Sequence, residues 1–473
     1  MASSSSSSSS ILFLISLSFL FFISPSSSAK ITLSLSPFPH HSSDPLQTIT
    51  SLASASLSRA HALKRPKSVN SSSSSSSTDS KYQTKTPLYP RSYGGYSVSL
   101  RFGTPPQILQ FVMDTGSSLV WFPCTSRYLC SKCSFPNSQN PPKFIPKKSS
   151  SSKLIGCQNP KCQLVLGATA KCDDATAGEN PKNKACPAYI IQYGSGSTIG
   201  QLLSETLNFP GKMVPDFIVG CSVLSIRQPS GIAGFGRGKE SLPSQLRLAK
   251  FSYCLVSHRF DDTSFSSDLV LYSSSSDDKQ PEGSISYTPF QKNPSLSSIP
   301  ALKEYYYILI RKVIVGKTHV KIPYRYLVPG SDGHGGTIVD SGTTFTYMEK
   351  PVFDAVSSEF AKQMANYTRA KGIENRTGLG PCFDISKEKS VNFPELVLQF
   401  KGGAKMNLPL TNYFSIVGSP GSVCLTVVTN DDVGGPESVG GPAIILGNYQ
   451  QQNFHIEYDL KNERFGFRRQ ICK

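Results

Sequence analysis

Long apolar runs are almost absent from this sequence of 473 residues. The one run, at 11–23, is too short for a comfortable membrane span, and no second run follows, which excludes a protein with several membrane-spanning helices. Small residues at 26–29 come directly after it, so residues 1–29 are predicted to be a secretory signal peptide, although the serine-rich start lacks the usual positive charge. The polar C-terminal end lacks the hydrophobic tail of a GPI signal. We expect no membrane attachment once the signal is removed.

Acidic residues are scarce relative to basic ones, with 31 Asp and Glu against 48 Lys and Arg and a net charge of +17. A protein this basic tends to adhere to polyanions. Nucleic acid is an unsuitable partner after export, and no recognition motif supports it. An acidic cell-wall polysaccharide is the polyanion that we expect. The alternative is that the charge is scattered over a solvated surface and has no partner.

The residue patterns of metal and phosphate sites are missing. Cys130 and Cys133 have the spacing of half a zinc site, but no second Cys or His pair stands at finger spacing. His334 belongs to a glycine-rich turn, and the glycine-rich segment 234–238 is not followed by the lysine and Ser/Thr of a phosphate loop. We therefore predict no metal and no cofactor.

Cysteine, in contrast, is present in twelve copies. In an exported chain cysteines indicate disulfides, here up to six, whose connectivity cannot be deduced from their order alone. Seven of the twelve lie between Cys124 and Cys186. The segment 124–186 is therefore predicted to be a loop-rich insertion held by several bridges.

Glycine and proline are also plentiful, at 36 and 34 residues, and aromatic and β-branched runs are frequent. This mixture is typical of an all-β protein with many turns, and the length is ample for two lobes with filled cores. A helix that begins at a proline is predicted at 351–364. The strand predictions are 96–102, 108–113, 189–193 with a glycine-rich hairpin tip at 194–197, 305–310 and 337–339.

A short motif occurs twice. Asp114-Thr115-Gly116-Ser117 and Asp340-Ser341-Gly342-Thr343 each follow an apolar strand, and the two aspartates are 226 residues apart. One such triplet is weak evidence, because it occurs by chance and in ordinary turns. Two at this separation indicate two similar lobes that each contribute one aspartate to a shared site.

Two facing carboxyl groups can hydrolyse a peptide bond without a metal. Like charges this close cannot both ionise comfortably, so one group stays protonated over a wide acidic range. The ionised carboxylate then accepts a proton from a water molecule, while the protonated one donates to the substrate carbonyl. Their titration belongs to the pair and not to Asp114 or Asp340 separately.

The neighbouring residues fit this chemistry. Gly116 and Gly342 let backbone amides approach the carboxylates. Thr115 and Ser341 can form hydrogen bonds across the interface between the lobes. Outer hydrogen bonds can come from Ser117 and Thr343.

These residues resemble those of the pepsin-like family of aspartic endopeptidases, over nearly all of 93–473. Trp121, seven residues after the first aspartate, and Tyr193-Gly194 match the family's tryptophan and the tyrosine of its flap. The resemblance implies that Trp121 and Tyr193 are hydrogen-bonded over a cleft and that the flap closes on the substrate. The segments 231–234 and 444–447 are similar to the family's two supports of the aspartate loops, with Ala233 where a larger residue is commoner.

Within the family the chain is similar to the plant nepenthesin-type branch. The features that carry this are the cystine-rich insertion and the segments 241–246, 251–254 and 445–453. The resemblance implies a bridge between Cys382 and Cys424 in the second lobe. Ser195 departs from the aspartate that the branch often has in the flap.

The resemblance implies a bilobal, all-β fold of two barrel-like lobes with a cleft between them. We expect a serine-rich, basic prosegment or linker at 30–92, an N-terminal lobe at 93–295 and a C-terminal lobe at 296–473, with the chain passing between lobes at 273–294. Basic residues of the prosegment, clustered at Arg59, Lys64, Arg65 and Lys67, are expected to lie across the acidic cleft near pH 7 and to release when acid discharges the carboxylates. The alternative is a passive linker.

The predicted function is that of a secreted aspartic endopeptidase, made as a zymogen and acting on proteins or peptides at acidic pH as a monomer. The alternative is an inactive relative that binds and inhibits a glycoside hydrolase, but such binders typically lose part of a triplet, and both are intact here. The expected location is the apoplast or cell wall, with the vacuole as the alternative. Asn366 and Asn375 begin glycosylation sequons, and Asn70 begins a third.

Overall fold

The computed structural model describes most of the chain beyond the predicted signal peptide. The described residues are 45–64, 83–90, 94–133, 142–167, 184–194, 196–228, 230–257, 265–273, 284–296, 299–388, 390–417, 421–430 and 440–473. The predictions for residues 1–29, the Asn70 sequon, Arg65, Lys67 and Ser195 lie outside these ranges. Among the described residues no helix is long and apolar enough to cross a membrane.

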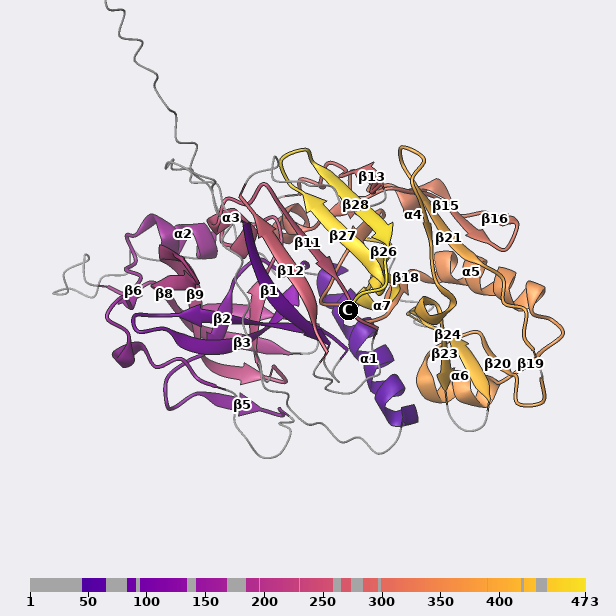
Figure 1. Cartoon of the computed structure of the whole chain (residues 1–473), viewed down its shortest axis with the longest axis horizontal. Helices are drawn as coiled ribbons and strands as arrows, with labels where there is room; N and C mark the ends of the chain where they lie inside the picture. The colour runs from indigo at the N-terminus through magenta and orange to yellow at the C-terminus, as the bar shows by residue number, and fades with distance from the viewer. Residues whose placement is uncertain are drawn as a thin grey trace, which may run out of the picture.

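The first half of the chain folds mainly into one large sheet (Figure 1). Its strand order is β13-β28-β27-β11-β12-β1-β2-β3-β10-β4-β9-β8-β6, with β5 on β9 and β7 on β8. The bounds of these strands, apart from β13, β27 and β28, are β1 Gln83–Pro90, β2 Tyr96–Phe102, β3 Gln107–Asp114, β4 Trp121–Pro123, β5 Leu129–Ser131, β6 Lys153–Leu154, β7 Tyr189–Gln192, β8 Ser197–Phe209, β9 Lys212–Ile226, β10 Gly231–Gly234, β11 Lys250–Cys254 and β12 Ser267–Tyr272.

The second half forms three smaller sheets, with the orders β14-β17-β26-β18-β25, β16-β15-β21-β22 and β19-β20-β24-β23. Their strands are β14 Tyr307–Ile308, β15 Ile310–Val315, β16 Thr318–Val320, β17 Thr337–Val339, β18 Thr346–Met348, β19 Thr368–Arg369, β20 Cys382–Asp384, β21 Leu396–Phe400, β22 Lys405–Asn407, β23 Phe414–Val417, β24 Ser422–Leu425, β25 Val427–Val428 and β26 Ile444–Leu446. The described helices are α1 Pro45–Lys64, α2 Pro160–Leu166, α3 Leu242–Gln245, α4 Tyr324–Leu327, α5 Lys350–Gln363, α6 Lys371–Thr377 and α7 Asn448–Gln451, with 3₁₀ turns η2 Pro146–Lys148, η5 Pro300–Glu304 and η6 Leu410–Asn412.

The two halves are joined by strands from the end of the chain. β27 (Phe454–Asp459) and β28 (Arg464–Arg469), yellow in Figure 1, lie beside β11, and β27 pairs antiparallel with β11 from Lys250↔Asp459 to Cys254↔His455. A disulfide from Cys254 to Cys472 closes the same junction. The C-terminal strands therefore tie the second lobe to the first.

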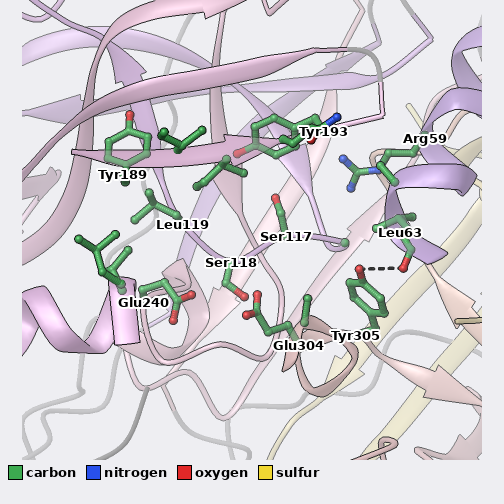
Figure 2. Close-up of a pocket in the computed structure, with 18 of the residues that line it drawn as sticks. Arg59, Leu63, Ser117, Ser118, Leu119, Tyr189, Tyr193, Glu240, Glu304 and Tyr305 are labelled. Atoms are coloured by element: carbon green, nitrogen blue, oxygen red, sulfur yellow. Dashed lines mark hydrogen bonds between the residues drawn. The ribbon is translucent and has the colours of Figure 1, made fainter. Parts of the chain in front are cut away.

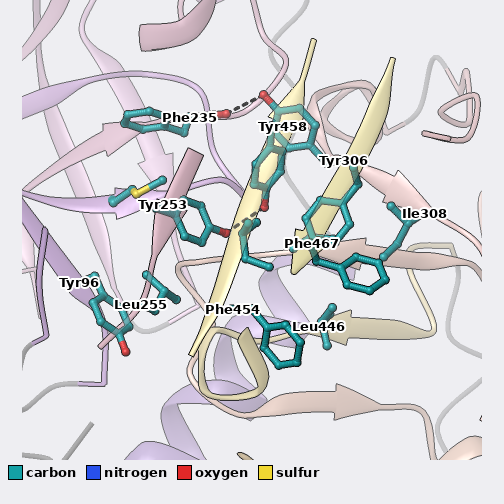
Figure 3. Packing of buried hydrophobic residues seen from close by; sticks show 14 of the residues in the cluster. Tyr96, Phe235, Tyr253, Leu255, Tyr306, Ile308, Leu446, Phe454, Tyr458 and Phe467 are labelled. Carbon is teal, nitrogen blue, oxygen red and sulfur yellow. Dashed lines mark hydrogen bonds between the residues drawn. The ribbon is translucent and has the colours of Figure 1, made fainter. Parts of the chain in front are cut away.

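Aromatic side chains fill the space beneath this junction (Figure 3). The ring of Phe251 on β11 stacks on Tyr458 of β27, with centroids 4.4 Å apart and planes at 11°. The Tyr306 hydroxyl donates to the Phe235 carbonyl at 2.8 Å, and the hydroxyls of Tyr253 and Tyr458 are 3.2 Å apart. Both lobes thus share one continuous core.

Several predicted elements match the described ones. The strands at 96–102, 108–113, 189–193 and 337–339 correspond to β2, β3, β7 and β17. The predicted helix at 351–364 is α5, which buries Val352, Val356 and Phe360 at helical spacing. The predicted strand at 305–310 is instead divided. After η5 ends at Glu304, this segment contributes residues to two separate strands, β14 and β15.

Two strands lie in segments that the sequence predicts to be linkers. β1 lies before the expected start of the first lobe, yet it pairs with β12 from Gln83↔Tyr272 to Leu88↔Ser267 and with β2 at Tyr89↔Ser97. The expected passage between lobes contains β13 (Ser286–Pro289), which pairs with β28. Both segments join the sheet through backbone hydrogen bonds to strands that are distant in the sequence. Local composition does not predict such long-range pairing.

Helix α1 comes from the segment expected to be a prosegment or linker, and it packs on the second lobe. Its apolar residues recur at helical spacing and are buried against side chains such as Tyr305, Phe345 and Tyr347. The buried apolar residues of α1 are Ile49, Leu52, Ala53, Ala60 and Leu63. The helix is stabilised by packing its apolar face on the second lobe. Its own composition therefore does not predict that the segment is folded.

The stack between Phe251 and Tyr458 generates a stability prediction. Changing Phe251 to Ala removes a fully buried ring at the junction of the lobes, and we expect the free energy of unfolding to fall by about 3–5 kcal/mol. Denaturant unfolding followed by fluorescence measures this loss. The control is Tyr324→Ala, at a side chain that is 64% exposed. Equal stability of the two variants would contradict a shared core.

Candidate functional site

The two aspartates occupy equivalent places in the two lobes. Asp114 ends β3, which is paired in parallel with β10 at Asp114↔Gly234. Asp340 directly follows β17, which is paired in parallel with β26 up to Val339↔Leu446. The two supporting segments identified in the sequence are thus strands β10 and β26. Both carboxyl groups are buried, with 1% and 0% of the residue exposed.

Each carboxylate is held by its own loop in the same way. The amide of Gly116 donates to Asp114 Oδ1 at 2.9 Å, and the hydroxyl of Ser117 donates to Oδ2 at 2.6 Å. In the second loop the amide of Gly342 donates to Asp340 Oδ1 at 2.9 Å, and the hydroxyl of Thr343 donates to Oδ2 at 2.5 Å. These bonds fix both carboxylates and favour their ionised forms.

Thr115 and Ser341 connect the two loops reciprocally. The amide of Ser341 donates to Thr115 Oγ1 at 2.9 Å, and the amide of Thr115 donates to Ser341 Oγ at 3.1 Å. Each hydroxyl donates onward to a carbonyl of the opposite lobe, Thr115 to Val339 at 3.3 Å and Ser341 to Met113 at 3.0 Å. The two aspartate loops are therefore held together by four buried hydrogen bonds.

The two glycines allow the carboxylates to come close. A Cβ atom added at Gly116 would lie 2.7 Å from Asp340 Oδ1, and one added at Gly342 would lie 2.5 Å from Asp114 Oδ1. Any side chain at either position would collide with the aspartate of the opposite lobe.

Arg59 of α1 joins the two carboxylates in this structure. Its Nη2 donates to Asp114 Oδ1 at 2.5 Å and its Nε to Asp340 Oδ2 at 3.1 Å. The side chain of Arg59 is only 11% exposed. A single buried guanidinium thus bridges the dyad, which is the position that the sequence-based hypothesis gave to basic residues of this segment.

The charges of Arg59, Asp114 and Asp340 shift one another's pKa values. Burial raises the pKa of Asp114 above its ordinary value, with Arg59 opposing and Asp340 adding to the rise. Burial alone would also raise the pKa of Asp340, but Arg59, the Thr343 hydroxyl and the Gly342 amide hold it below its ordinary value. Burial alone would lower the pKa of Arg59, but the two carboxylates raise it. Because Arg59 lowers the pKa of both carboxyl groups, protons and Arg59 compete for the dyad.

A hairpin lies against the Arg59 segment of α1. It is formed by β7 and β8, and the indole Nε1 of Trp121 donates to the hydroxyl of Tyr193 at 2.8 Å. At its tip a Cβ atom on Gly194 would lie only 2.1 Å from Cα of Arg59, so the hairpin backbone is pressed directly against α1. The helix therefore occupies the space between the hairpin and the aspartates.

A cavity of about 450 Å³ lies beside the dyad (Figure 2). Its walls come from the first aspartate loop, the hairpin, α1, and the segments around Glu240 and Glu304. Figure 2 shows Tyr193 and Ser117 on the side of the cavity toward Arg59, and Leu119 and Tyr189 farther from it. The sequence did not single out Glu240 or Glu304, since no motif contains them.

The other candidate residues are structural or lie on the surface. Cys382 and Cys424 face each other on β20 and β24 and form a disulfide. Asn366 and Asn375 are exposed, the latter within α6. The described bridges are Cys124–Cys221, Cys130–Cys133, Cys162–Cys186, Cys254–Cys472 and Cys382–Cys424.

His334 has an electrostatic partner that the sequence did not indicate. Its Nε2 is 2.8 Å from Oε2 of Glu349, which also forms a buried ion pair with Lys64 at the end of α1. The described residues contain no group of three His, Cys, Asp or Glu that could hold a metal ion. Lys64 thus gives α1 a second buried ionic contact, with Glu349 of the second lobe.

Known proteins are similar in sequence to this chain over most of its length. The family models described as Xylanase inhibitor N-terminal and Xylanase inhibitor C-terminal match residues 96–271 and 305–469. A probable aspartyl protease of Arabidopsis thaliana is 32% identical over 80% of this chain and 82% of its own length. The aspartic proteinase nepenthesin-2 of Nepenthes gracilis is 34% identical over 81% of this chain and 79% of its own.

Solved structures share the fold. The structure of edgp covers 83% of this chain and 96% of its own with a TM-score of 0.62 at 22% identity. Basic 7S globulin from soybean covers 81% and 94% with a TM-score of 0.58 at 18% identity. The predicted all-β, bilobal fold class is confirmed. The family models and the aspartic proteinase relatives show that the chain belongs to the pepsin-like family of aspartyl proteases, in the plant branch that includes the nepenthesins.

Proposed function

We propose that this protein is an aspartic endopeptidase, made as a secreted zymogen and active in acid. The observation that carries the proposal is the dyad itself. Both Asp-[Thr/Ser]-Gly triplets are intact, each carboxylate accepts the same two hydrogen bonds from its loop, and four further bonds join the loops. The disulfides among the described residues support an oxidising compartment.

In the proposed reaction the two carboxyl groups share one proton after α1 has left the cleft. The ionised group accepts a proton from a water molecule, which attacks the peptide carbonyl carbon. The protonated group donates its proton to the carbonyl oxygen, giving a tetrahedral intermediate. Proton transfer to the amide nitrogen then allows the C–N bond to break. Tyr193 and the hairpin would exclude water and hold the substrate backbone.

Arg59 is the proposed block on this reaction before activation. While its guanidinium bridges the carboxylates, neither can bind a substrate or a nucleophilic water. Protonation of the dyad removes the charges that hold Arg59, so the block should be stable near neutral pH and weaken as the pH falls. Lys64 and the apolar face of α1 would keep the helix in place until then.

The alternative function is a binding protein that inhibits a glycoside hydrolase, the class named in the matching family models. The intact dyad favours catalysis. The partners expected from the sequence, protein or peptide substrates and an acidic polysaccharide, remain predictions.

The first prediction concerns the dyad. Asp114→Asn and Asp340→Asn should each retain the fold and lower kcat by at least about 10³-fold, because each removes one acid or base from the pair. The measurement is cleavage of a denatured protein substrate between pH 2.5 and 6, with and without pepstatin. Asp354→Asn, an exposed carboxylate on α5, is the matched control.

If the acid-treated wild type shows no pepstatin-sensitive cleavage at any pH in this range, the endopeptidase proposal is wrong. Inhibition of a xylanase by the same preparation would then support the binding protein. Near-full activity in either dyad variant would instead contradict the assignment of that aspartate.

The second prediction concerns Arg59. Replacing it with Gln leaves two buried carboxylates without their cation, so we expect pepstatin-sensitive activity to begin at a higher pH, roughly one pH unit or more above the wild type. The measurement is the pH dependence of initial cleavage by freshly purified full-length protein. Arg59→Lys, which keeps the positive charge, should resemble the wild type more closely than Arg59→Gln does. Identical activation profiles for the wild type and Arg59→Gln would contradict the proposed block.

A further inference from the structure

Two carboxyl groups outside the dyad meet in the wall of the cavity. Glu240 lies just before α3, and Glu304 is the last residue of η5. Figure 2 shows both side chains directed toward Ser118, the residue that follows Ser117 of the first aspartate loop. Neither glutamate belongs to the triplets, the hairpin or their hydrogen-bond network.

Backbone contacts fix the positions of these two groups. The amide of Arg237 donates to the carbonyl of Glu304 at 2.8 Å, and the amide of Gly238 donates to Ser118 Oγ at 3.0 Å. A Cβ atom added at Gly238 would lie 2.9 Å from Glu240 Oε2. The segments that carry the two glutamates are therefore packed on each other and on the aspartate loop.

This acidic pair has no cation of its own among the described residues. Arg237 pairs with Glu463 at 2.6 Å and Arg59 with the dyad, and the sequence neighbours Lys239 and Lys303 are exposed to solvent. Burial, and then the neighbouring Glu304, raise the pKa of Glu240 to about 8. Burial also raises the pKa of Glu304, although a hydrogen bond from Ser118 opposes the rise. These raised pKa values favour the protonated forms of both groups, and a cation placed between the two carboxyl groups would lower both pKa values again.

The remaining walls of the cavity are mainly apolar. Leu119, Val165 and Leu166 line it together with Tyr189 and Tyr193. A volume of about 450 Å³ is ample for one long side chain. Apolar walls that lead to a pair of acids suit a side chain with an aliphatic stem and a cationic end.

Helix α1 covers this cavity in the present structure. Arg59, Ala62 and Leu63 form part of its lining, and the carbonyl of Leu63 accepts a hydrogen bond from the Tyr305 hydroxyl at 3.1 Å (Figure 2). Departure of α1 would open the cavity along the same path that frees the dyad. A peptide in the cleft would then run past Ser117 and place a neighbouring side chain over the two glutamates.

We propose that this cavity is a specificity pocket for a lysine or arginine side chain of the substrate, within a few residues of the scissile bond, with Glu240 and Glu304 as its charge partners. The inference rests on the proposed endopeptidase function and names its substrate class. The cation lies between the two carboxyl groups, and the aliphatic stem packs on Leu119 and Leu166. The pocket binds one basic side chain of the substrate, and the proposal includes no binding site for a second one.

The test uses peptide pairs that differ only in lysine or norleucine, which has a similar stem without the ammonium group. The residue is placed in turn at each of the three positions on either side of one cleavable bond. For acid-activated protein we expect kcat/KM to favour lysine by about 10- to 100-fold at one position. The double variant Glu240→Gln/Glu304→Gln should bring this ratio close to one, and the single variants show which carboxylate carries more of the preference. Asp354→Asn should leave the ratio unchanged.

Failure of the pocket and failure of the enzyme are distinguishable. Equal cleavage of both peptides at every position, or a lysine preference that survives in the double variant, would overturn the specificity pocket while leaving the peptidase intact. If neither peptide is cleaved, calorimetric binding of uncleavable reduced-amide versions decides: tighter binding of the lysine peptide, lost in the double variant, supports the pocket, and equal binding rejects it. Thermal unfolding confirms that each variant is folded.

Discussion

The site depends on the reciprocal hydrogen bonds between Thr115 and Ser341. These bonds link two loops that lie far apart in the chain, and each amide finds its partner only in the opposite lobe. Buried amides and hydroxyls without partners are costly, so either loop alone would be destabilised. The same bonds bring the carboxyl groups of Asp114 and Asp340 close enough together for a single guanidinium to contact both. The chemistry of the dyad thus depends on how the two lobes are positioned, which the pairing of β11 with β27 also determines.

That arrangement also explains why a cationic helix can occupy the cleft. Two carboxylates that are buried and close together need a positive charge when both are ionised. Arg59 supplies it from α1, and the planar guanidinium reaches both groups at once. The apolar face of α1 also packs on buried aromatic residues of the second lobe. Charge neutralisation and apolar burial therefore act together on the same helix.

Sequence reasoning identified the dyad, its hydroxyl neighbours, and Trp121 with Tyr193, because each belongs to a motif with fixed local spacing. The fold class followed from the duplicated triplet and from the turn-rich composition. It did not place β1 or β13 in the sheet, since the partners of these strands lie far away in the chain. Glu240 and Glu304 were not predicted, because they are far apart in the sequence. They line one cavity only when η5 and the segment before α3 pack together. Arg59 was one of several basic residues until its distance to both carboxylates was known.

The pairing of β1 has a consequence for how the chain can be shortened. β1 is bonded to β12 on one side and to β2 on the other, so removing it would leave an open edge in the middle of the large sheet. A proteolytic cut that spares the sheet must therefore fall before Gln83. The first cysteine in the sequence is Cys124, so no disulfide can retain the severed piece. Once such a cut is made, α1 is held by contacts alone, and its departure becomes a dissociation that dilution makes irreversible.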